Sequence, residues 1–249
     1  MRIYFLTVML LFSWISCSKK PTPLAIGHRG AKGYVAENTL ASVQKALALG
    51  VDGIEIDVFV CQTGELVVFH DKTLEKLTDA TGYIEALPLD SIRKITVLGS
   101  EPIPTLNEIL DEVPGKVVLN IELKGAGTAK PTIDLLDTYF QAQKIAPKDI
   151  LISSFDWNEL AIFFANNAEV PIAVLTEDDP LDAIPVAQQL KAVAINPDFK
   201  SLTAENVDKI HKQKLKIYPW TVNTEEDIQK MIDLGVDGII SDFPDRIQK

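Results

Sequence analysis

Short apolar runs rich in β-branched residues alternate with amphipathic segments along most of the chain. The runs, which we expect to be strands, are residues 24–27, 53–59, 117–123, 150–154, 172–175, 192–195, 217–222 and 238–241. Between them, apolar residues recur at helical spacing over residues 39–49, 105–112, 131–143, 157–166, 183–190, 203–211 and 224–234. This alternation indicates βαβ units and a parallel sheet. Eight strands in a chain of 249 residues predict a (β/α)8 TIM barrel, with an open doubly wound sheet as the alternative.

One part of the chain departs from this alternation. After the second predicted strand, a turn over residues 62–65 leads into an apolar run at residues 66–71, which we expect to form a hairpin with that strand. Residues 72–104 then show no clean periodicity and carry several glycines and prolines. We interpret them as a short insertion in the barrel rather than as a separate domain.

The chain is acidic, with a net charge of −11 at pH 7. We do not expect it to bind nucleic acid, because that requires clustered lysines and arginines. The same charge repels anionic substrates, so a phosphate-binding site needs local positive charge of its own. With 47% hydrophobic residues, the chain can bury the core of one large domain, and its length also suits two small ones.

The start of the chain has the features of a lipoprotein-type signal peptide, residues 1–16. A basic residue precedes an apolar segment that is too short to span a bilayer comfortably, and a small residue stands directly before Cys17. We expect Cys17 to carry a lipid after cleavage, residues 17–23 to form a polar tether, and residues 24–249 to form the barrel. The protein would then be exported, held at a membrane by this anchor alone, and face the periplasm or the cell surface. An uncleaved anchor helix, or an ordinary signal peptide with a coincidental cysteine, is the alternative.

The second predicted strand carries two carboxylates inside an apolar run. Side chains alternate between the two faces of a strand, so Glu55 and Asp57 share one face while their apolar neighbours occupy the other. Two acids on a buried face need a counter-charge, and a cation held by oxygen ligands supplies it. The alternative is an ordinary half-exposed strand whose acids are solvated.

In a (β/α)8 barrel, reactive groups gather at the C-terminal ends of the strands. The predicted strand ends carry two of the three histidines, His28 and His70. Such a pair can divide acid and base work in phosphoryl chemistry, although a lone histidine is more often a structural hydrogen-bonding group. Glu122 ends the third strand, so it would join Glu55 and Asp57 as a third carboxylate ligand of Mg²⁺ or Ca²⁺.

Three more residues at the strand ends are candidates for substrate binding. Arg29 offers a two-pronged fork to a phosphate, and Lys124 offers a point charge. The alternative for both is a salt bridge with the nearby acids. Trp220 would form a wall for an apolar or glycerol-like group, or belong to the core. His211 lies among lysines in a polar helical segment, and we expect it at the surface.

Several of these residues fall in short segments that follow one another in a fixed order. The segments are Gly27-His28-Arg29-Gly30, Glu37-Asn38-Thr39, Glu55-Ile56-Asp57-Val58, Val68-Phe69-His70-Asp71, Ile103-Pro104-Thr105-Leu106, Asn120-Ile121-Glu122-Leu123-Lys124, Trp220-Thr221-Val222-Asn223 and Ser241-Asp242-Phe243-Pro244. Together they resemble the glycerophosphodiester phosphodiesterase family. The resemblance implies a (β/α)8 barrel that hydrolyses glycerophosphodiesters to an alcohol and glycerol 3-phosphate.

The resemblance also implies roles for the candidate residues. A divalent cation would be bound by Glu55, Asp57 and Glu122. The general acid and base would be His28 and His70. The phosphate contacts would come from Arg29 and Lys124. A neighbouring glycerol hydroxyl would attack phosphorus first, giving a cyclic phosphate that water then opens.

Two other functions are alternatives at this point. A membrane tether suits a phospholipase of the C or D type that acts on intact or lyso-phospholipids. A surface-binding lipoprotein could keep the barrel without catalysis, but the presence of both histidines and all three acids argues against it. The choice between Mg²⁺ and Ca²⁺ and the oligomeric state stay open. The head-group preference also stays open, because the insertion departs from the family pattern at residues 77–82.

Overall fold

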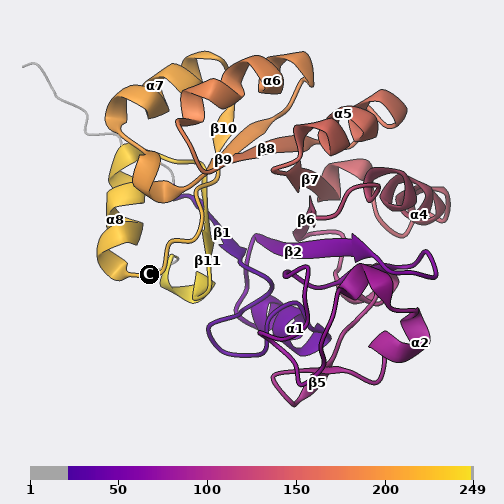
Figure 1. Ribbon diagram of the computed structural model, residues 1–249. Coiled ribbons are helices and arrows are strands. Elements are labelled where there is room, and N and C mark those ends of the chain that lie inside the picture. The colour runs from indigo at the N-terminus through magenta and orange to yellow at the C-terminus, as the bar shows by residue number, and fades with distance from the viewer. Residues whose placement is uncertain (1–21, 248–249) are drawn as a thin grey trace, which may run out of the picture.

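The computed structural model describes residues 22–247, which form a (β/α)8 barrel (Figure 1). Eight parallel strands lie side by side in the order β10–β9–β8–β7–β6–β2–β1–β11. They are β1 (Leu24–Gly27), β2 (Gly53–Val60), β6 (Val118–Leu123), β7 (Ile150–Ser154), β8 (Ile172–Thr176), β9 (Ala194–Pro197), β10 (Lys216–Ile217) and β11 (Gly238–Ser241). The predicted fold class is therefore confirmed.

Helices cover the outside of the strands (Figure 1). They are α1 (Leu40–Ala48), α3 (Leu106–Glu112), α4 (Ala129–Gln141), α5 (Trp157–Asn166), α6 (Ile184–Gln189), α7 (Ala204–Lys212) and α8 (Glu225–Leu234). Short 3₁₀ helices lie at Ile84–Ala86, Pro147–Asp149, Pro180–Ala183, Phe199–Ser201 and Pro244–Arg246. Within the described part of the chain, none of the helices has both the length and the apolar character that crossing a membrane requires.

The barrel closes between β10 and β11 through hydrogen bonds outside the regular strands. Val222 N donates to the Ile240 carbonyl at 3.0 Å, and Ile240 N donates to the Pro219 carbonyl at 2.9 Å. The strand predicted at residues 217–222 is therefore wrong in extent, because its regular part ends at Ile217. Beyond Ile217 the chain still bonds to β9, from Tyr218 N to the Ile195 carbonyl and from Trp220 N to the Pro197 carbonyl, both at 3.1 Å, but it no longer forms a regular strand.

Along each strand, side chains point alternately outward to the helices and inward to the barrel interior. On β2, Ile54, Ile56 and Val58 are fully buried in the main core with residues of the surrounding helices. Glu55 and Asp57 alternate with them and project to the other side, as predicted. Below these acids, the interior is filled by a small apolar cluster made of Ile26, Leu151, Ala173, Ala194, Tyr218 and Ile240.

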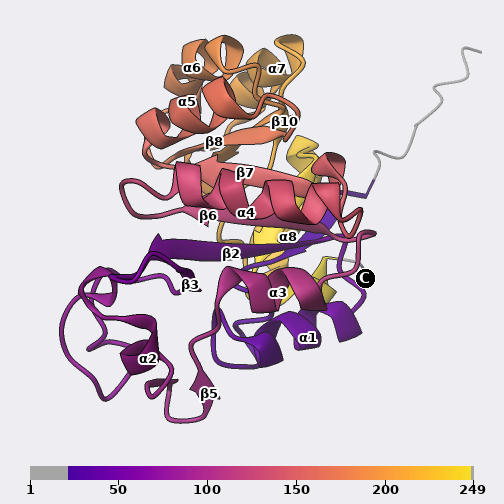
Figure 2. The same ribbon diagram turned by 90° about the vertical axis from the view of Figure 1, so that its right-hand side faces the viewer.

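The segment after β2 forms a small lobe with a core of its own (Figure 2). The strand β3 (Leu66–Val68) pairs antiparallel with β2, as the predicted hairpin requires. The lobe continues through α2 (Leu89–Ile92) and the short hairpin of β4 (Thr96–Val97) and β5 (Glu101–Pro102). Its core is separate from that of the barrel and consists of Phe59, Cys61, Val67, Phe69, Leu74, Leu77, Ile84, Ile92, Ile95, Val97 and Ile103.

Two identical turns lead into barrel strands in the same way. Residues 50–54 and 235–239 share the sequence Gly-Val-Asp-Gly-Ile. The carboxylate of Asp52 accepts a hydrogen bond from Ala25 N at 2.8 Å, and that of Asp237 accepts one from Ile217 N at 2.9 Å. Each aspartate therefore satisfies a backbone donor on the neighbouring strand, at the end of the barrel opposite the strand C-termini.

The turn between β1 and α1 holds the backbone close to β2. Gly30 has φ of +83° and its N–H donates to the Glu55 carbonyl at 3.2 Å. The Ser42 hydroxyl on α1 donates to the Arg29 carbonyl at 2.8 Å and accepts from Ala31 N at 2.9 Å. A Cβ at Gly30 would lie 2.3 Å from Ser42 Oγ, so only glycine fits between α1 and this turn.

We expect Gly30→Ala to lower the free energy of unfolding by about 3 kcal/mol, because it adds a steric overlap to the strain of a left-handed backbone. Gly82→Ala is the matched control, since Gly82 has φ of +103° but open space where a Cβ would lie. It should lower the free energy of unfolding by about 1–2 kcal/mol, the cost of the backbone strain alone. Urea denaturation at equilibrium measures both values. Equal losses in the two variants would contradict the packing argument.

Candidate active site

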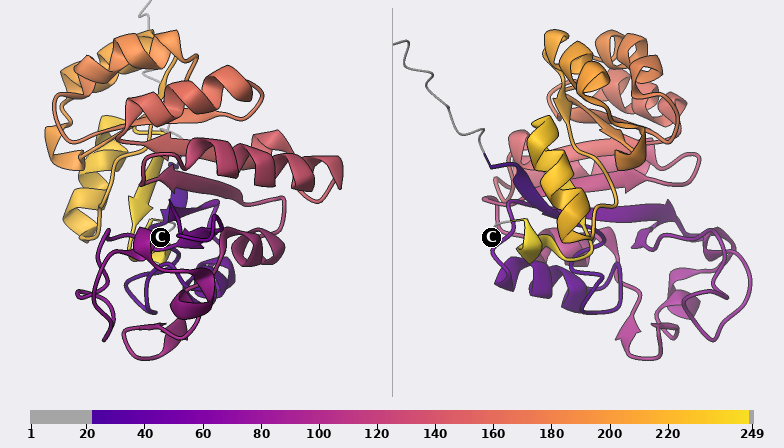
Figure 3. Two further views of the ribbon diagram at one scale, coloured as in Figure 1. Left: turned by 45° about the vertical axis from the view of Figure 1, so that its right-hand side comes forward. Right: turned by 90° about the vertical axis from the view of Figure 1, so that its left-hand side faces the viewer.

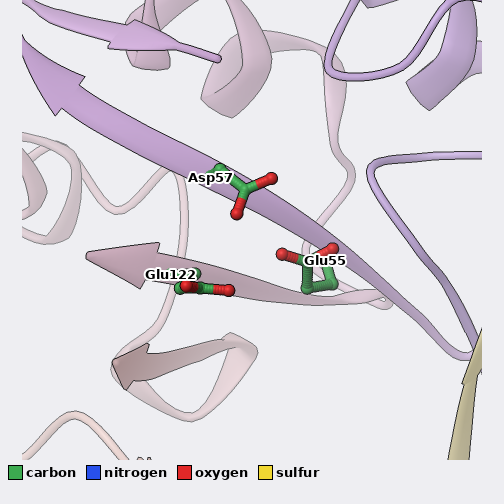
Figure 4. A group of neighbouring side chains, drawn as sticks. All are labelled: Glu55, Asp57 and Glu122. Atoms are coloured by element: carbon green, nitrogen blue, oxygen red, sulfur yellow. The ribbon is translucent and has the colours of Figure 1, made fainter. Parts of the chain in front are cut away.

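Three carboxylates meet between the middle of β2 and the C-terminal end of β6 (Figure 4). Glu55 and Asp57 lie on β2, and Glu122 lies opposite Asp57 in the parallel register with β6. One oxygen of each carboxylate lies within 4.8 Å of an oxygen of the other two. All three side chains are buried, so the interpretation as solvated acids of an exposed strand is excluded.

Two basic side chains partly compensate this negative charge. Arg29 Nε lies 3.4 Å from Asp57 Oδ2, and the Arg29 guanidinium also pairs with Glu37. Lys124 Nζ lies 2.8 Å from Glu122 Oε1 and 3.8 Å from Asp57 Oδ1. The salt bridges considered as an alternative for Arg29 and Lys124 are therefore present. Both residues also line the pocket above the carboxylates.

The pKa values of the three acids show that the compensation is incomplete. Burial raises the pKa of Glu55 well above its usual range, and the charges of Asp57 and Glu122 raise it further. Burial and the Asp57 charge raise the pKa of Glu122 to about 7, although Lys124 opposes the rise. Burial also tends to raise the pKa of Asp57, but the positive charges of Arg29 and Lys124 have the larger effect and hold this pKa below its usual value. Full ionisation of the cluster therefore calls for one more positive charge.

The donor set fits a hard divalent cation. Carboxylate oxygens are the ligands that Mg²⁺ and Ca²⁺ prefer, and a cation bound to three of them supplies the missing charge compensation. Asp57 Oδ1 is buried and accepts no hydrogen bond from any residue that the structure describes. Its other oxygen accepts from the Asn38 amide at 2.8 Å, and the Asn38 carbonyl oxygen accepts from Asp57 N at 3.2 Å. One oxygen is thus fixed by the protein and the other is left for a ligand.

The two histidines each contact a carboxylate through Nδ1. His28 Nδ1 lies 2.6 Å from Asp242 Oδ1, and His70 Nδ1 lies 2.6 Å from Asp71 Oδ1. Because a carboxylate only accepts, Nδ1 carries the ring proton in the neutral histidine and Nε2 is left unprotonated. Burial lowers the pKa of both histidines despite these carboxylates. Each ring therefore presents an Nε2 that can accept a proton.

The histidines lie around a single pocket with the carboxylate cluster. His28 Nε2 lies 4.0 Å from Glu55 Oε2, and His70 Nε2 lies 3.3 Å from Lys124 Nζ. The pocket has a volume of about 260 Å³. Its lining includes seven of the eight barrel residues predicted for the site: His28, Arg29, Glu55, His70, Glu122, Lys124 and Trp220. The eighth, Asp57, lies behind the lining as part of the carboxylate cluster.

Trp220 is half-buried in the wall of this pocket. Its indole N–H donates to the Asn196 carbonyl at 2.9 Å, which fixes the ring. The ring meets Phe155 edge to face, with the centroids 5.5 Å apart. Trp220 and Phe155 therefore line the pocket together, and the role of Trp220 toward a substrate stays a prediction. His211 lies far from the site on α7, where it contacts Asp237 and is about one-third exposed.

The sequence model of the glycerophosphoryl diester phosphodiesterase family matches residues 28–246. The chain belongs to this family. A glycerophosphodiester phosphodiesterase of Caldanaerobacter subterraneus subsp. tengcongensis is 32% identical over 90% of this chain and 96% of its own length. One of Bacillus altitudinis is 34% identical over 89% of this chain and 95% of its own length. An Oleispira antarctica phosphodiesterase, solved in complex with the product sn-glycerol-3-phosphate, superposes with a TM-score of 0.83 at 29% identity, covering 91% of this chain and 96% of the other.

Some residues of this phosphodiesterase site cannot be recognised as site residues from their type and position in the sequence. Asn38 supports Asp57, and Asn223 donates to Asp242 Oδ2 at 2.8 Å, which fixes the carboxylate that orients His28. Asp242 and Asn223 belong to segments that carry the family resemblance, and that was their only signal. Phe155 and Glu177 had none, because each follows a strand in a loop without a motif. Cys17, the predicted lipid attachment site, lies outside the described residues.

Asp242→Asn is expected to remove the tautomer preference of His28. Both oxygens of Asp242 accept hydrogen bonds, one from His28 and one from Asn223, and an asparagine can accept through only one of them. ¹⁵N NMR of the imidazoles should show His28 protonated at Nδ1 in the wild type and mixed in the variant. His70, held by Asp71, is the internal control. Asp245→Asn, which alters an exposed contact with Tyr34, should leave both histidines as they are. A His28 signal unchanged in Asp242→Asn would contradict the assignment.

Proposed function

We propose that this protein hydrolyses glycerophosphodiesters to an alcohol and glycerol 3-phosphate with the aid of one divalent cation. The observation that carries the proposal is the convergence of two carboxylate-oriented histidines on one pocket with a buried three-carboxylate cluster. The names of the bacterial relatives and the product bound to the Oleispira antarctica enzyme support this choice of substrate. Membership of the family supports the dependence on a metal.

The phosphate would be bound between the carboxylate cluster and the basic side chains. Glu55, Asp57 and Glu122 would hold the cation, which offsets the negative charge of the phosphodiester when it is bound. Lys124 and Arg29 lie at the same place and add the local positive charge that an acidic protein needs for an anionic substrate. Mg²⁺ and Ca²⁺ both suit such an oxygen site.

The two histidines would divide the proton transfers. One Nε2 accepts the proton of the hydroxyl that attacks phosphorus, and the other histidine, in its protonated form, donates a proton to the oxygen of the departing alcohol. Asp242 and Asp71 support both steps, because each stabilises the positive charge that its histidine carries after accepting a proton. The same carboxylates hold the rings in orientation, so the Nε2 atoms are positioned before substrate arrives.

We expect His28→Ala and His70→Ala each to lower kcat for glycerophosphocholine by about 10²–10⁴-fold, the usual contribution of a general acid or base. His211→Ala is the control, because this histidine lies on α7 away from the pocket. The activity of the His211→Ala variant should equal that of the wild type.

Removal of the metal is a second test. EDTA should abolish turnover, and added Mg²⁺ or Ca²⁺ should restore it. Full activity in His28→Ala, or turnover that survives EDTA, would exclude the mechanism.

The same assay tests the choice of substrate class. Lysophosphatidylcholine, offered at equal concentration, represents the phospholipases considered above. We expect a higher kcat/KM for glycerophosphocholine, because the pocket volume of about 260 Å³ suits a small polar diester. A clear preference for the lysolipid would instead assign the protein to the phospholipases.

We also propose that the protein is exported and attached to a membrane through a lipid on Cys17. The lipoprotein-type sequence of residues 1–16 supports this, and the place where the barrel begins would set how the barrel faces the membrane. Because the barrel strands are parallel, β1 begins at the end opposite the strand C-termini, and the two side views show β2 running away from that end (Figure 2; Figure 3, right). A tether of residues 17–23 reaches at most about 25 Å. The anchored barrel would thus direct its pocket away from the bilayer, toward soluble diesters.

Cys17→Ser should abolish the membrane attachment while leaving the enzyme active, because Cys17 lies outside the barrel sequence. Phase separation in a mild detergent measures the attachment, with the lipidated wild type expected in the detergent phase and the variant in the aqueous phase. Cys61→Ser is the control, since this buried thiol belongs to the lobe core and is not expected to carry a lipid. A wild-type protein found only in the aqueous phase would contradict the lipid anchor.

A further inference from the structure

The mouth of the barrel has two chemically different halves. The histidines, the carboxylate cluster and the basic side chains come from β1, β2, β6 and the hairpin beside them. The other half comes from β7, β8 and the chain after β10, and contributes Phe155, Leu175, Glu177 and Trp220 to the same pocket. A phosphodiester bound at the first half therefore has one of its two alcohol groups near the second.

The second half offers aromatic rings whose positions are fixed. Trp220 is held by its bond to the Asn196 carbonyl, and it packs edge to face against Phe155. Phe155 is 38% exposed and lines the pocket, so its ring is accessible there. Lys124 Nζ lies 5.7 Å from the centroid of this ring, so Phe155 marks the border between the two halves.

Glu177 adds a negative charge to this aromatic wall. It follows β8 directly and is exposed at the pocket. Among residues 22–247, no side chain makes a hydrogen bond or an ion pair with its carboxylate. A carboxylate without a partner beside aromatic rings is the combination that binds ammonium groups, through charge attraction and cation–π contact together.

We propose that Phe155, Glu177 and Trp220 form a subsite for a positively charged head group, so that the enzyme prefers diesters of an amino alcohol or quaternary ammonium alcohol. This inference rests on the proposed function, because it concerns one alcohol group of the same substrate. The bound diester would be zwitterionic, with its phosphate at the cationic half and its ammonium at the acidic half. The two charges of the substrate would thus match the two halves of the pocket.

The surroundings of Glu177 favour the same type of substrate. The loop continues with Asp178 and Asp179, and no basic residue occurs before α6. The charge of Asp179 interacts with Lys209 of α7, so Glu177 and Asp178 are the acids that contribute a negative potential at this side of the mouth. Such a field repels a head group that carries its own negative charge and attracts an ammonium.

Two substrates of equal shape isolate the effect of the charge. Glycerophosphocholine carries a quaternary ammonium, and its 3,3-dimethylbutyl analogue has a carbon atom in place of the nitrogen. We expect wild-type kcat/KM to be about tenfold higher for the choline ester, mainly through KM, since a cation–π and carboxylate contact at a partly exposed site has about this strength. Glu177→Gln should reduce this ratio to about two, and Phe155→Leu should reduce it in the same direction.

Asp178→Asn is the matched control, because it removes the same charge from the next residue, which does not line the pocket. It should keep most of the preference. Equal rates of the wild type on the two esters would overturn the subsite while leaving the proposed function intact. A ratio unchanged in Glu177→Gln, with both rates lowered together, would place Glu177 at the glycerol group and also overturn it. If Asp178→Asn lowers the ratio of the two kcat/KM values as much as Glu177→Gln does, the preference comes from the general electric field at the mouth and not from a subsite. Turnover of neither ester would overturn the proposed function itself.

Discussion

The burial of three carboxylates within 4.8 Å of one another is the constraint on which the rest of the site depends. In the interior of a protein such a cluster is strongly unfavourable unless positive charge and hydrogen bonds compensate it. Arg29 and Lys124 supply two charges, and Asn38 and the Arg29 backbone N–H supply hydrogen bonds to Asp57 and Glu55. The raised pKa values of the two glutamates show that this is not enough. A divalent cation would supply the compensation that is still missing, and this cluster could hold one.

The regular geometry of the barrel strands is enough to bring most of these groups together. The period of two along β2 places two acids on one face, and the parallel register with β6 brings Glu122 opposite Asp57. The tight turn at Gly30 then carries Arg29 over the same strand. Most of the site therefore follows from regular strands and one turn, and the hairpin after β2 adds His70 from the side.

Regular features of this kind are also what the sequence could predict. The strand positions, the three acids, both histidines and the two basic residues were predicted, because alternation and barrel geometry determine where strand ends meet. The early end of β10 was not, since the chain after it pairs only through single backbone hydrogen bonds. Asp242 lies 214 residues from His28, and a contact over that distance leaves no local pattern. The lobe after β2 has its own core but no periodicity, because its elements are only a few residues long.

Carboxylates act in two opposite ways in this pocket, and burial decides which. The buried acids on β2 and β6 lose their hydration, and a cation held by them would help an acidic protein to bind an anionic phosphodiester. Glu177 and Asp178 are exposed and keep their hydration, so they need no partner and act through the field they project across the mouth. The first group allows the phosphate to bind, and the second bears on the charge of the alcohol attached to it. A net charge of −11 is therefore compatible with an anionic substrate, provided that the negative charge is divided in this way.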